Sequence, residues 1–388
     1  MKRGASNMEV KRINRNRVFR YINETDKTSM PDIASALGMS GPTVLQIVKE
    51  LMELSLVKEV GMFQSTGGRK AKAIAVEQEY CYSLGVDITR NHLSFVLIDL
   101  AENIQKYVRI RKPFVFEETY FSEIRELLTG FVEDCQIPGE KIIGVGISVP
   151  GIVDQIQNKI TKAHTLNLLD VDGSIFSKYI PYPYTILNDA NAAVMAECSK
   201  EEKPGNLVYL SLSNTVGGAF VFKQKGMNGM GYQNGLFEKI YTGDNWRSGE
   251  FGHMVIHPGG EKCYCGKEGC LDAYCSALRL ADLTDGDLGV FFKEMENGND
   301  KYRAIWETYL DDLAIAVDNL RMCFDCDVVL GGYVGSYMEP YLDRLQEKIA
   351  KKNIFGYTGD YLKVCKYRTE MSALGAAVYQ IEKYINTI

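Results

Sequence analysis

The chain has 388 residues, of which 46% are hydrophobic and 24% charged, a balance ordinary for a soluble globular protein of about two or three domains. No apolar run reaches the ~18 residues of a membrane-spanning helix, and no apolar segment follows the basic N-terminus as in a secretory signal. We therefore expect a cytoplasmic protein without a membrane partner. Residues 1–78 carry 13 Lys and Arg against 8 Asp and Glu, although the whole chain has a net charge of −6. A basic segment on an acidic body suggests a module that binds a polyanion.

Residues 16–78 have the pattern of three helices followed by a β-hairpin. Ser29 is a suitable N-cap for a helix whose first turn contains Asp32, and Gly38 is a suitable glycine to end that helix. Ser40 then caps a second helix, and a helix, a short glycine-containing turn and a second helix make a helix-turn-helix. The apolar stripe of this second helix is Val44, Ile47, Val48 and Leu51. We predict a winged helix-turn-helix domain over residues 1–78.

The second helix of this module would enter the major groove of DNA, with its N-terminal residues nearest to the base edges. Strands predicted at 58–60 and 72–76 bracket a turn whose basic residues would reach phosphates or the minor groove. The predicted DNA contacts are Ser40, Thr43, Gln46, Lys49, Arg69 and Lys70. The alternative is a small packing module of three helices that binds no nucleic acid, but the pattern, the wing and the charge together favour DNA.

After the predicted linker at 76–81, the pattern changes to strands that alternate with helices. The apolar runs that predict strands are 82–88, 93–100, 142–150, 185–187, 207–213, 218–222 and 327–334. Helices are predicted near 118–134 and around 276–325. Strands alternating with helices predict an α/β architecture.

A histidine and three closely spaced cysteines have the spacing H-x9-C-x-C-x4-C. They are His253, Cys263, Cys265 and Cys270. One imidazole and three thiolates make the tetrahedral set that zinc prefers, and four protein ligands leave no open position, so we predict a structural zinc ion. His257 is a second nearby imidazole that could compete as ligand, and a loop with incidental thiols is the alternative. The other seven cysteines, including the CxxC pair Cys323 and Cys326, are predicted to be small packing side chains.

Polar side chains typical of sugar sites follow one of the predicted strands. Asn188 and Asp189 stand at the carboxyl end of the strand 185–187, the edge at which ligands bind in open α/β sheets. Glu250 lies near His253, whose second ring nitrogen could hydrogen-bond a sugar hydroxyl while the first binds the metal. Each acid taken alone is more often a solvated loop residue, but paired carboxylates with Asn and His supply the acceptors and donors that sugar hydroxyls need.

Three segments, NRNRVFRYI, SMPDIASALGMSGPTVLQIVKELMELSLVKEVG and STGGRKAKAIAV, resemble the DNA-binding domain of the ROK family (repressors, open reading frames, kinases). The family's G-H…C-x-C-G-x2-G-C element also matches without gaps, which favours His253 over His257 as the zinc ligand. The resemblance implies a two-lobed actin/hexokinase-like (ribonuclease H-like) sensor domain. Its first lobe would be 79–190, completed by the C-terminal helix 370–388, and its second lobe 191–369.

The resemblance also implies which residues bind a hexose in the cleft. ROK proteins use the Asn-Asp pair, the E-x-G-H pair and the acid after G-C-L, and an N-L element is a weaker candidate. The corresponding residues are Asn167, Asn188, Asp189, Glu250, His253 and Asp272. Asp272 stands where the family usually has Glu, and its shorter side chain would change which sugar fits.

Phosphoryl transfer also needs loops that cradle the phosphates of ATP. Where ROK kinases have a D-x-G-G-T-K-like turn, residues 87–92 read DITRNH, and the second loop, usually G-T-G-x-G, reads SNTVGG at 213–218. Asp189 matches the family's catalytic base, but we predict that this role has lapsed. We therefore predict a transcription regulator, a repressor of genes for sugar uptake and catabolism, that is controlled by sugar binding in the cleft. It would bind a two-fold symmetric operator as a homodimer or homotetramer. The alternatives are an ATP-dependent hexose or N-acetylhexosamine kinase and a regulator that answers to a partner protein.

Overall fold

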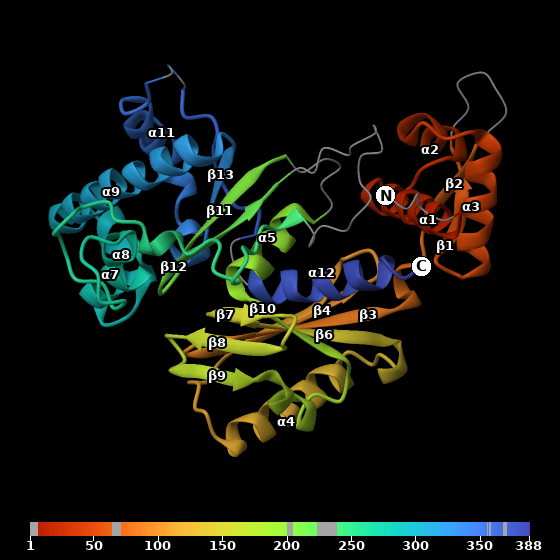
Figure 1. Ribbon diagram of the computed structural model, residues 1–388, viewed down its shortest axis with the longest axis horizontal. Helices are drawn as coiled ribbons and strands as arrows, with labels where there is room; N and C mark the ends of the chain where they lie inside the picture. Colours follow the sequence, from red (N-terminus) through yellow and green to blue (C-terminus); the bar gives the residue numbers. More distant parts are fainter. Residues whose placement is uncertain are drawn as a thin grey trace.

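The computed structural model describes residues 7–63, 71–199, 205–222, 239–354, 356, 358–367 and 371–388. An N-terminal domain and two α/β lobes can be distinguished (Figure 1). Within these ranges, no helix combines the length and the apolar character that crossing a membrane requires.

The N-terminal domain has three helices and an antiparallel strand pair. They are α1 (Asn7–Glu24), α2 (Met30–Leu37), α3 (Gly41–Glu53), β1 (Val57–Met62) and β2 (Lys72–Val76). The predicted capping is confirmed, because Ser29 accepts a hydrogen bond from the backbone of Asp32, Gly38 ends α2 with a φ of 62°, and Ser40 accepts from the backbone of Thr43. The apolar stripe of α3 is buried. The predicted helix-turn-helix and hairpin are therefore present.

The first lobe is built on a five-stranded sheet with the order β10-β6-β3-β4-β5. Its strands are β3 (Tyr82–Ile88), β4 (His92–Asp99), β5 (Ile104–Arg111), β6 (Ile142–Val149) and β10 (Tyr184–Asn188). β3, β4 and β5 are antiparallel neighbours, whereas β6 is parallel to β3 and β10 is parallel to β6. Helix α4 (Glu118–Asp134) covers one face, as predicted from its sequence (Figure 1). A small sheet lies beside it, formed by β7 (Ile152–Asp154), β8 (Lys159–Ala163) and β9 (Leu168–Asp172).

The second lobe has a four-stranded sheet with the order β12-β11-β13-β14. Its strands are β11 (Leu207–Leu212), β12 (Val216–Val221), β13 (Asp327–Gly331) and β14 (Leu362–Val364). Its helices are α6 (Leu271–Cys275), α7 (Ala277–Ala281), α8 (Leu288–Glu296), α9 (Asp300–Phe324), α10 (Gly332–Gly335) and α11 (Leu342–Ala350). Helices are expected around 276–325, and the structure has one long helix there, α9 with 25 residues, preceded by the shorter α7 and α8.

Two helices, α5 (Asp189–Cys198) and α12 (Met371–Ile385), lie between the sheets of the two lobes (Figure 1). α12 rests directly on the backbone of the first sheet, because a β-carbon on Gly85 would lie 1.8 Å from the carbonyl oxygen of Ala373. α5 begins at Asp189, directly after β10 ends at Asn188. The candidate site described below lies at this junction.

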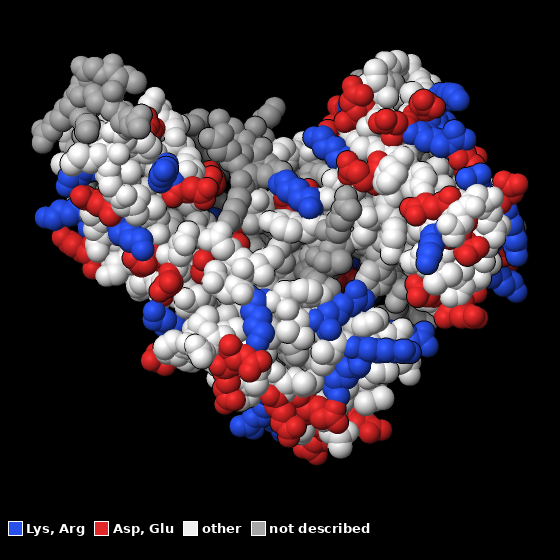
Figure 2. Space-filling view, turned by 180° about the vertical axis from the view of Figure 1, so that it is seen from behind, with Lys and Arg blue, Asp and Glu red and all other residues white. Residues whose placement is uncertain are grey.

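The charged side chains are unevenly distributed over the surface. Figure 2 shows acidic side chains gathered at the lower end of the molecule, the end at which α4 lies in Figure 1. The sequence of α4 includes Glu118, Glu123, Glu126, Glu133 and Asp134. This end of the first lobe is therefore poorly suited to a polyanion, in contrast to the basic N-terminal segment.

Candidate metal centre, sugar cleft and DNA-binding surface

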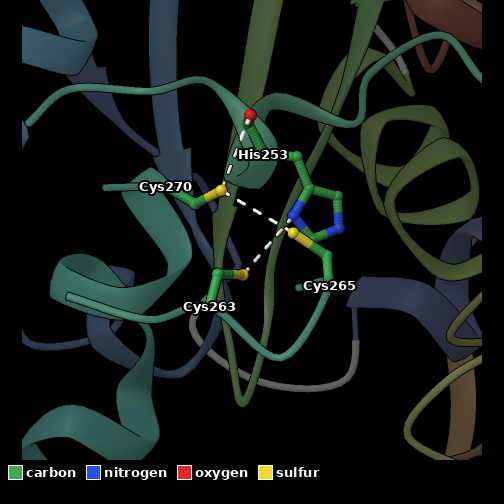
Figure 3. A group of neighbouring side chains, drawn as sticks. All are labelled: His253, Cys263, Cys265 and Cys270. Atoms are coloured by element: carbon green, nitrogen blue, oxygen red, sulfur yellow. Dashed lines mark hydrogen bonds between the residues drawn. The ribbon is translucent and has the colours of Figure 1, made fainter. Parts of the chain in front are cut away.

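The four residues of the His-Cys motif converge in the second lobe. A short 3₁₀ turn, Phe251–His253, places His253, and the loop that leads into α6 supplies the three cysteines. The Cys263 Sγ–His253 Nδ1 distance and the Cys265 Sγ–Cys270 Sγ distance are both 3.7 Å, and one ligand atom from each residue lies within 4.8 Å of all the others (Figure 3). Zn–S bonds of about 2.3 Å in a tetrahedron place sulfur atoms about 3.8 Å apart. The donor set and its spacing therefore fit a metal ion such as zinc.

The ionisation of the three thiols also fits a cation. Burial raises the pKa of the Cys263 thiol to about 12 and also raises the pKa of Cys270. At Cys265 burial acts in the same direction, but a hydrogen bond from the backbone N–H of Lys267 and bonds from the two neighbouring thiols outweigh it and lower the pKa. A bound divalent cation would favour the thiolate at all three positions, since coordination deprotonates thiols.

His257, the competing ligand that the sequence left open, lies outside this cluster. Its Nε2 is 2.6 Å from Asp312 Oδ1, and its ring makes an edge contact with Tyr274. Among the described residues that could hold a metal, the structure groups His253 with the three cysteines.

Asn188 and Asp189 stand where β10 turns into α5. Asn188 caps this helix, because its Oδ1 accepts from the backbone of Asn191 at 2.9 Å. Its Nδ2 donates to the carbonyl of Gly151 at 3.0 Å and to Asp189 Oδ1 at 3.1 Å. Asp189 Oδ1 also accepts from the backbone of Ala190 at 2.9 Å. Asn188 thus holds the Asp189 carboxyl in place, and its polar atoms are already engaged.

Two carboxyl groups, those of Asp189 and Asp87, line the cavity between the lobes. Burial, together with the nearby Asp87 carboxyl, raises the pKa of Asp189 to about 7. Burial also raises the pKa of Asp87, to about 6, against the opposing effects of Ser148 and Arg109. Asp87 comes from β3, and it was not among the site residues predicted from the sequence, although its place in the DITRNH turn was a usable signal.

Glu250 and His253 form the other side of the site. With Nδ1 of His253 directed at Cys263, its Nε2 lies 3.8 Å from Glu250 Oε2 and 3.4 Å from the hydroxyl of Tyr264. Burial raises the pKa of Glu250, and the Glu250 charge in turn contributes to the raised pKa of Asp189. One imidazole nitrogen therefore faces the metal centre while the other faces the Glu250 carboxylate and the Tyr264 hydroxyl.

Tyr264 is a site residue that sequence reasoning missed. It lies between two of the clustered cysteines, and its ring is 4.4 Å from that of His164 in the β8–β9 turn of the first lobe. Its position inside the C-x-C element was the only available signal. Tyr264 therefore links the cysteine-rich loop of the second lobe to the first lobe.

Asp272 and Asn167, the two remaining predicted sugar ligands, differ in their surroundings. Asp272 is 5% exposed, and its Oδ2 accepts from the backbone N–H of Val216 at 2.6 Å. Burial raises its pKa to about 6. This carboxylate therefore anchors the start of β12 with one oxygen. Asn167 is exposed on the β8–β9 turn with a φ of 52°.

A cavity of about 960 Å³ opens between the lobes. Asp189 and Asp87 line it, together with Arg90 and Arg109 of the first lobe and Tyr333 of the second. The Arg109 guanidinium lies over the Tyr333 ring, 5.4 Å from its centroid. The two lobes thus touch across the cavity through residues that the sequence did not single out.

The outer face of α3 carries exposed polar residues. They are Ser40, Thr43, Gln46 and Lys49. The hydroxyls of Ser40 and Thr43 are 2.7 Å apart, and Gln46 Nε2 donates to Glu50 Oε1 at 3.0 Å. The predicted wing contacts Arg69 and Lys70 lie outside the described residues. The four positions on α3 have the exposure that base contacts require.

Comparisons with known proteins agree with this arrangement. A sequence model described as the ROK family matches residues 83–383, and one described as a winged helix-turn-helix DNA-binding domain matches residues 12–58. The chain is 29% identical to the xylose repressor of Bacillus subtilis (strain 168) over 281 residues, which cover 70% of this chain and 67% of that protein. It is 26% identical to the DNA-binding transcriptional dual regulator NagC of Escherichia coli (strain K12) over 268 residues, or 68% of this chain and 62% of that protein.

A solved structure extends the likeness to the whole chain. The crystal structure of a ROK family transcriptional regulator, described as a homolog of the E. coli MLC protein, matches with a TM-score of 0.74 and 17% identity. The match covers 98% of both chains. At this identity the likeness concerns the fold, and it confirms the predicted order of a helix-turn-helix domain followed by a two-lobed domain.

Proposed function

This chain belongs to the ROK family, and we propose that it is a transcriptional repressor that binds operator DNA and is controlled by a sugar in the cleft between its lobes. The observation that carries the proposal is that one chain combines an exposed α3 face on a winged helix-turn-helix with a cavity between the lobes that is lined by Asp189. The charge of Glu250 reaches Asp189, and His253 lies 3.8 Å from Glu250. Relatives that are named xylose repressor and NagC support the same combination.

The proposed sugar ligands are Asn167, Asn188, Asp189, Glu250, His253 and Asp272. Asp189, Glu250 and His253 would make the direct contacts, since Asn188 is engaged in holding Asp189. The proposed DNA contacts are Ser40, Thr43, Gln46 and Lys49, with Arg69 and Lys70 from the wing. The proposed domains are 1–78, a first lobe 79–190 completed by 370–388, and a second lobe 191–369.

We propose that His253, Cys263, Cys265 and Cys270 hold a structural zinc ion. Four protein ligands leave no position for water or substrate, so the ion would organise the loop and orient His253 toward the sugar. We also propose a homodimer or homotetramer, because paired recognition helices suit a two-fold symmetric operator.

The altered phosphate loops support a lapsed kinase activity. The turn after β3 is closed by its own side chain, because Thr89 Oγ1 accepts from the backbone of His92 and donates to its carbonyl, each at 3.0 Å. Arg90 and Tyr333 line the cavity, whereas a nucleotide bound there would need backbone amides around its phosphates. Asp189 would then serve as a sugar ligand and not as a base.

We expect no turnover when the protein is incubated with ATP, Mg²⁺ and each of a panel of hexoses and N-acetylhexosamines. ADP release in a coupled assay measures this, with an active sugar kinase as the positive control. Sugar-dependent ADP release that Asp189→Ala abolishes would overturn this assignment and favour the kinase alternative.

A saturating cognate sugar is expected to weaken operator binding by the full-length protein by about 5- to 150-fold, the usual range of allosteric coupling. The operator is obtained by selection from random duplexes, and the sugar by thermal-shift screening, since a ligand of the native state raises its stability. Binding is then measured by fluorescence anisotropy at fixed salt concentration.

Gln46→Ala serves as the control for the DNA side of this experiment. It should weaken binding to the selected operator by about 1–3 kcal/mol, as expected for a lost base contact, and leave sugar affinity unchanged. An operator affinity that no sugar alters would contradict sugar control and point to a partner protein as the effector.

A further inference from the structure

Helix α12 connects the sugar site with the DNA-binding domain. At its amino end, Ser372 Oγ donates to the backbone carbonyl of Asp189 at 3.2 Å. At its carboxyl end, Glu382 pairs with Arg20 of α1. Because ten residues of helix span about 15 Å, α12 carries these two contacts about 15 Å apart along its axis. Figure 1 shows α12 running between the lobes, with the C-terminus beside the N-terminal domain.

Helices α12 and α5 are packed in direct contact, so we expect them to move together. A β-carbon on Gly375 would lie 1.6 Å from the carbonyl oxygen of Ala192, so the two helices touch through their backbones. α5 begins with Asp189 itself. A shift of the Asp189 backbone on sugar binding would therefore be passed to α12, because no loose side-chain layer separates the helices to absorb it.

The joint with the DNA-binding domain is polar and partly buried. The side chains of Arg20 and Glu382 are 21% and 9% exposed. Arg20 Nη2 also donates to Asn386 Oδ1, and Arg12 Nη1 donates to the carbonyl of Asn386, each at 3.1 Å. A buried ion pair contributes little net stability, but its geometry fixes how two surfaces meet. This joint therefore sets the orientation of α1 relative to α12.

The connection after the hairpin is anchored as well. The carbonyl of Gln78 accepts from the backbone of Leu100, and the carbonyl of Glu79 accepts from Lys141 Nζ, at 3.1 and 2.8 Å. These two hydrogen bonds tie the predicted linker 76–81 to the first lobe. The linker therefore restricts independent rotation of the DNA-binding domain. One continuous cluster of buried apolar side chains includes Phe19 of α1 and Ile381 of α12.

We infer that Arg20, Glu382 and Ser372 are positioning residues of the switch, through which α12 transmits the state of the sugar site to the DNA-binding domain. The inference rests on the proposed function. Neither Arg20 nor Glu382 lines the cavity between the lobes, and neither belongs to α3, so they would act on the coupling between the two binding events and not on either event directly. Closure of the lobes tilts α12, and the Arg20–Glu382 pair makes α1 follow.

The experiment measures three quantities on full-length protein: sugar affinity by calorimetry, operator affinity without sugar, and operator affinity with saturating sugar. The ratio of the two operator affinities is the coupling. For Arg20→Leu and for Asn386→Ala, we expect sugar affinity within twofold of wild type and a coupling ratio at least fivefold smaller. Asn386→Ala leaves no buried charge unpaired, so it keeps the test valid where Arg20→Leu fails to fold.

The charge reversal Arg20→Glu with Glu382→Arg should recover part of the ratio that either single reversal loses, a rescue that general destabilisation would not give. Ser372→Ala should lower the ratio from the other end of the helix. The matched control is Arg344→Leu, which removes an Arg–Glu pair with Glu307 in the second lobe and should leave the ratio unchanged.

The wild-type ratio and the variant ratios separate the two proposals. A wild-type ratio of one would overturn the proposed function and this inference together. A wild-type ratio above one that Asn386→Ala, Ser372→Ala and the folded Arg20 variants all preserve would overturn the role of α12 alone, and it would favour transmission through contacts between subunits.

Discussion

Changing Cys265 to serine is expected to empty the metal centre and to lower the free energy of unfolding by more than about 4 kcal/mol, a size of effect typical of a lost structural metal. Cys265 is exposed, so the same substitution in a metal-free loop would change stability by no more than about 0.5 kcal/mol. The size of the effect therefore distinguishes a metal ligand from an incidental thiol.

Metal analysis and thermal unfolding measure the two consequences of Cys265→Ser. The wild type should contain about one zinc per chain, because four ligands close one site. Cys323→Ser is the matched control, since Cys323 lies outside the cluster and is also an exposed thiol, so the prediction that it packs in the interior was wrong. It should keep the metal and its stability. A Cys265→Ser variant that retained one zinc per chain would show that Cys265 is not a ligand.

The features that the sequence predicts well depend on short stretches of chain. Ser29, Gly38 and Ser40 act on their own helix ends, so their capping roles follow from the identity of residues three positions away. The His-Cys cluster spans only residues 253–270, and its glycines allow the loop to fold on itself. Local chemistry therefore determines these features before tertiary packing is considered.

The sugar cleft shows where residue types alone are insufficient. Asn188 and Asp272 stay predicted sugar ligands, and each has a further role that their residue types do not reveal: Asn188 caps α5 and holds Asp189, and Asp272 uses one oxygen on the backbone of Val216. The capping by Asn188 is local, since Asn191 lies three positions away, whereas Val216 lies 56 positions from Asp272 and meets it only through tertiary packing. The Arg20–Glu382 pair joins residues 362 positions apart, and no periodicity within either helix indicates it.

Replacing Asp189 with asparagine is expected to weaken sugar binding by about 10- to 100-fold at pH 8, the 1.5–3 kcal/mol of a hydrogen bond to a charged group. Asparagine is nearly isosteric, and its Oδ1 can still accept from Ala190 and Asn188, so the local structure should survive. The loss therefore measures the charge of Asp189 and not a collapse of the site. Calorimetry with the cognate sugar provides the affinities.

The pH dependence of sugar binding follows from the raised pKa of Asp189, about 7. A sugar hydroxyl donates to the carboxylate and so favours the charged form. Wild-type affinity should therefore rise from pH 6 to pH 8 and then level off, whereas Asp189→Asn should bind with nearly constant affinity over this window. Burial also raises the pKa of Asp87 and of Asp272 to about 6, so the change in affinity between pH 7 and pH 8 reports mainly on Asp189.

Stability should change in the opposite sense to binding. The pKa of Asp189 is higher in the folded protein than the ordinary 3.8, so folding favours its neutral form. Ionisation therefore destabilises the fold: the effect is absent below about pH 4, grows as pH rises, and is complete above about pH 7. Asp189→Asn should be more stable than wild type at pH 8, by up to about 4 kcal/mol, and by less at pH 5.

Asp285→Asn, on the exposed rim of the same cavity, is the control and should alter neither the sugar affinity nor the stability. Two results would contradict these expectations. A wild-type affinity that stays constant between pH 6 and pH 8 would show that the Asp189 carboxylate does not bind the sugar. An Asp189→Asn protein that is less stable than wild type at pH 8 would show that burial does not raise the pKa of Asp189.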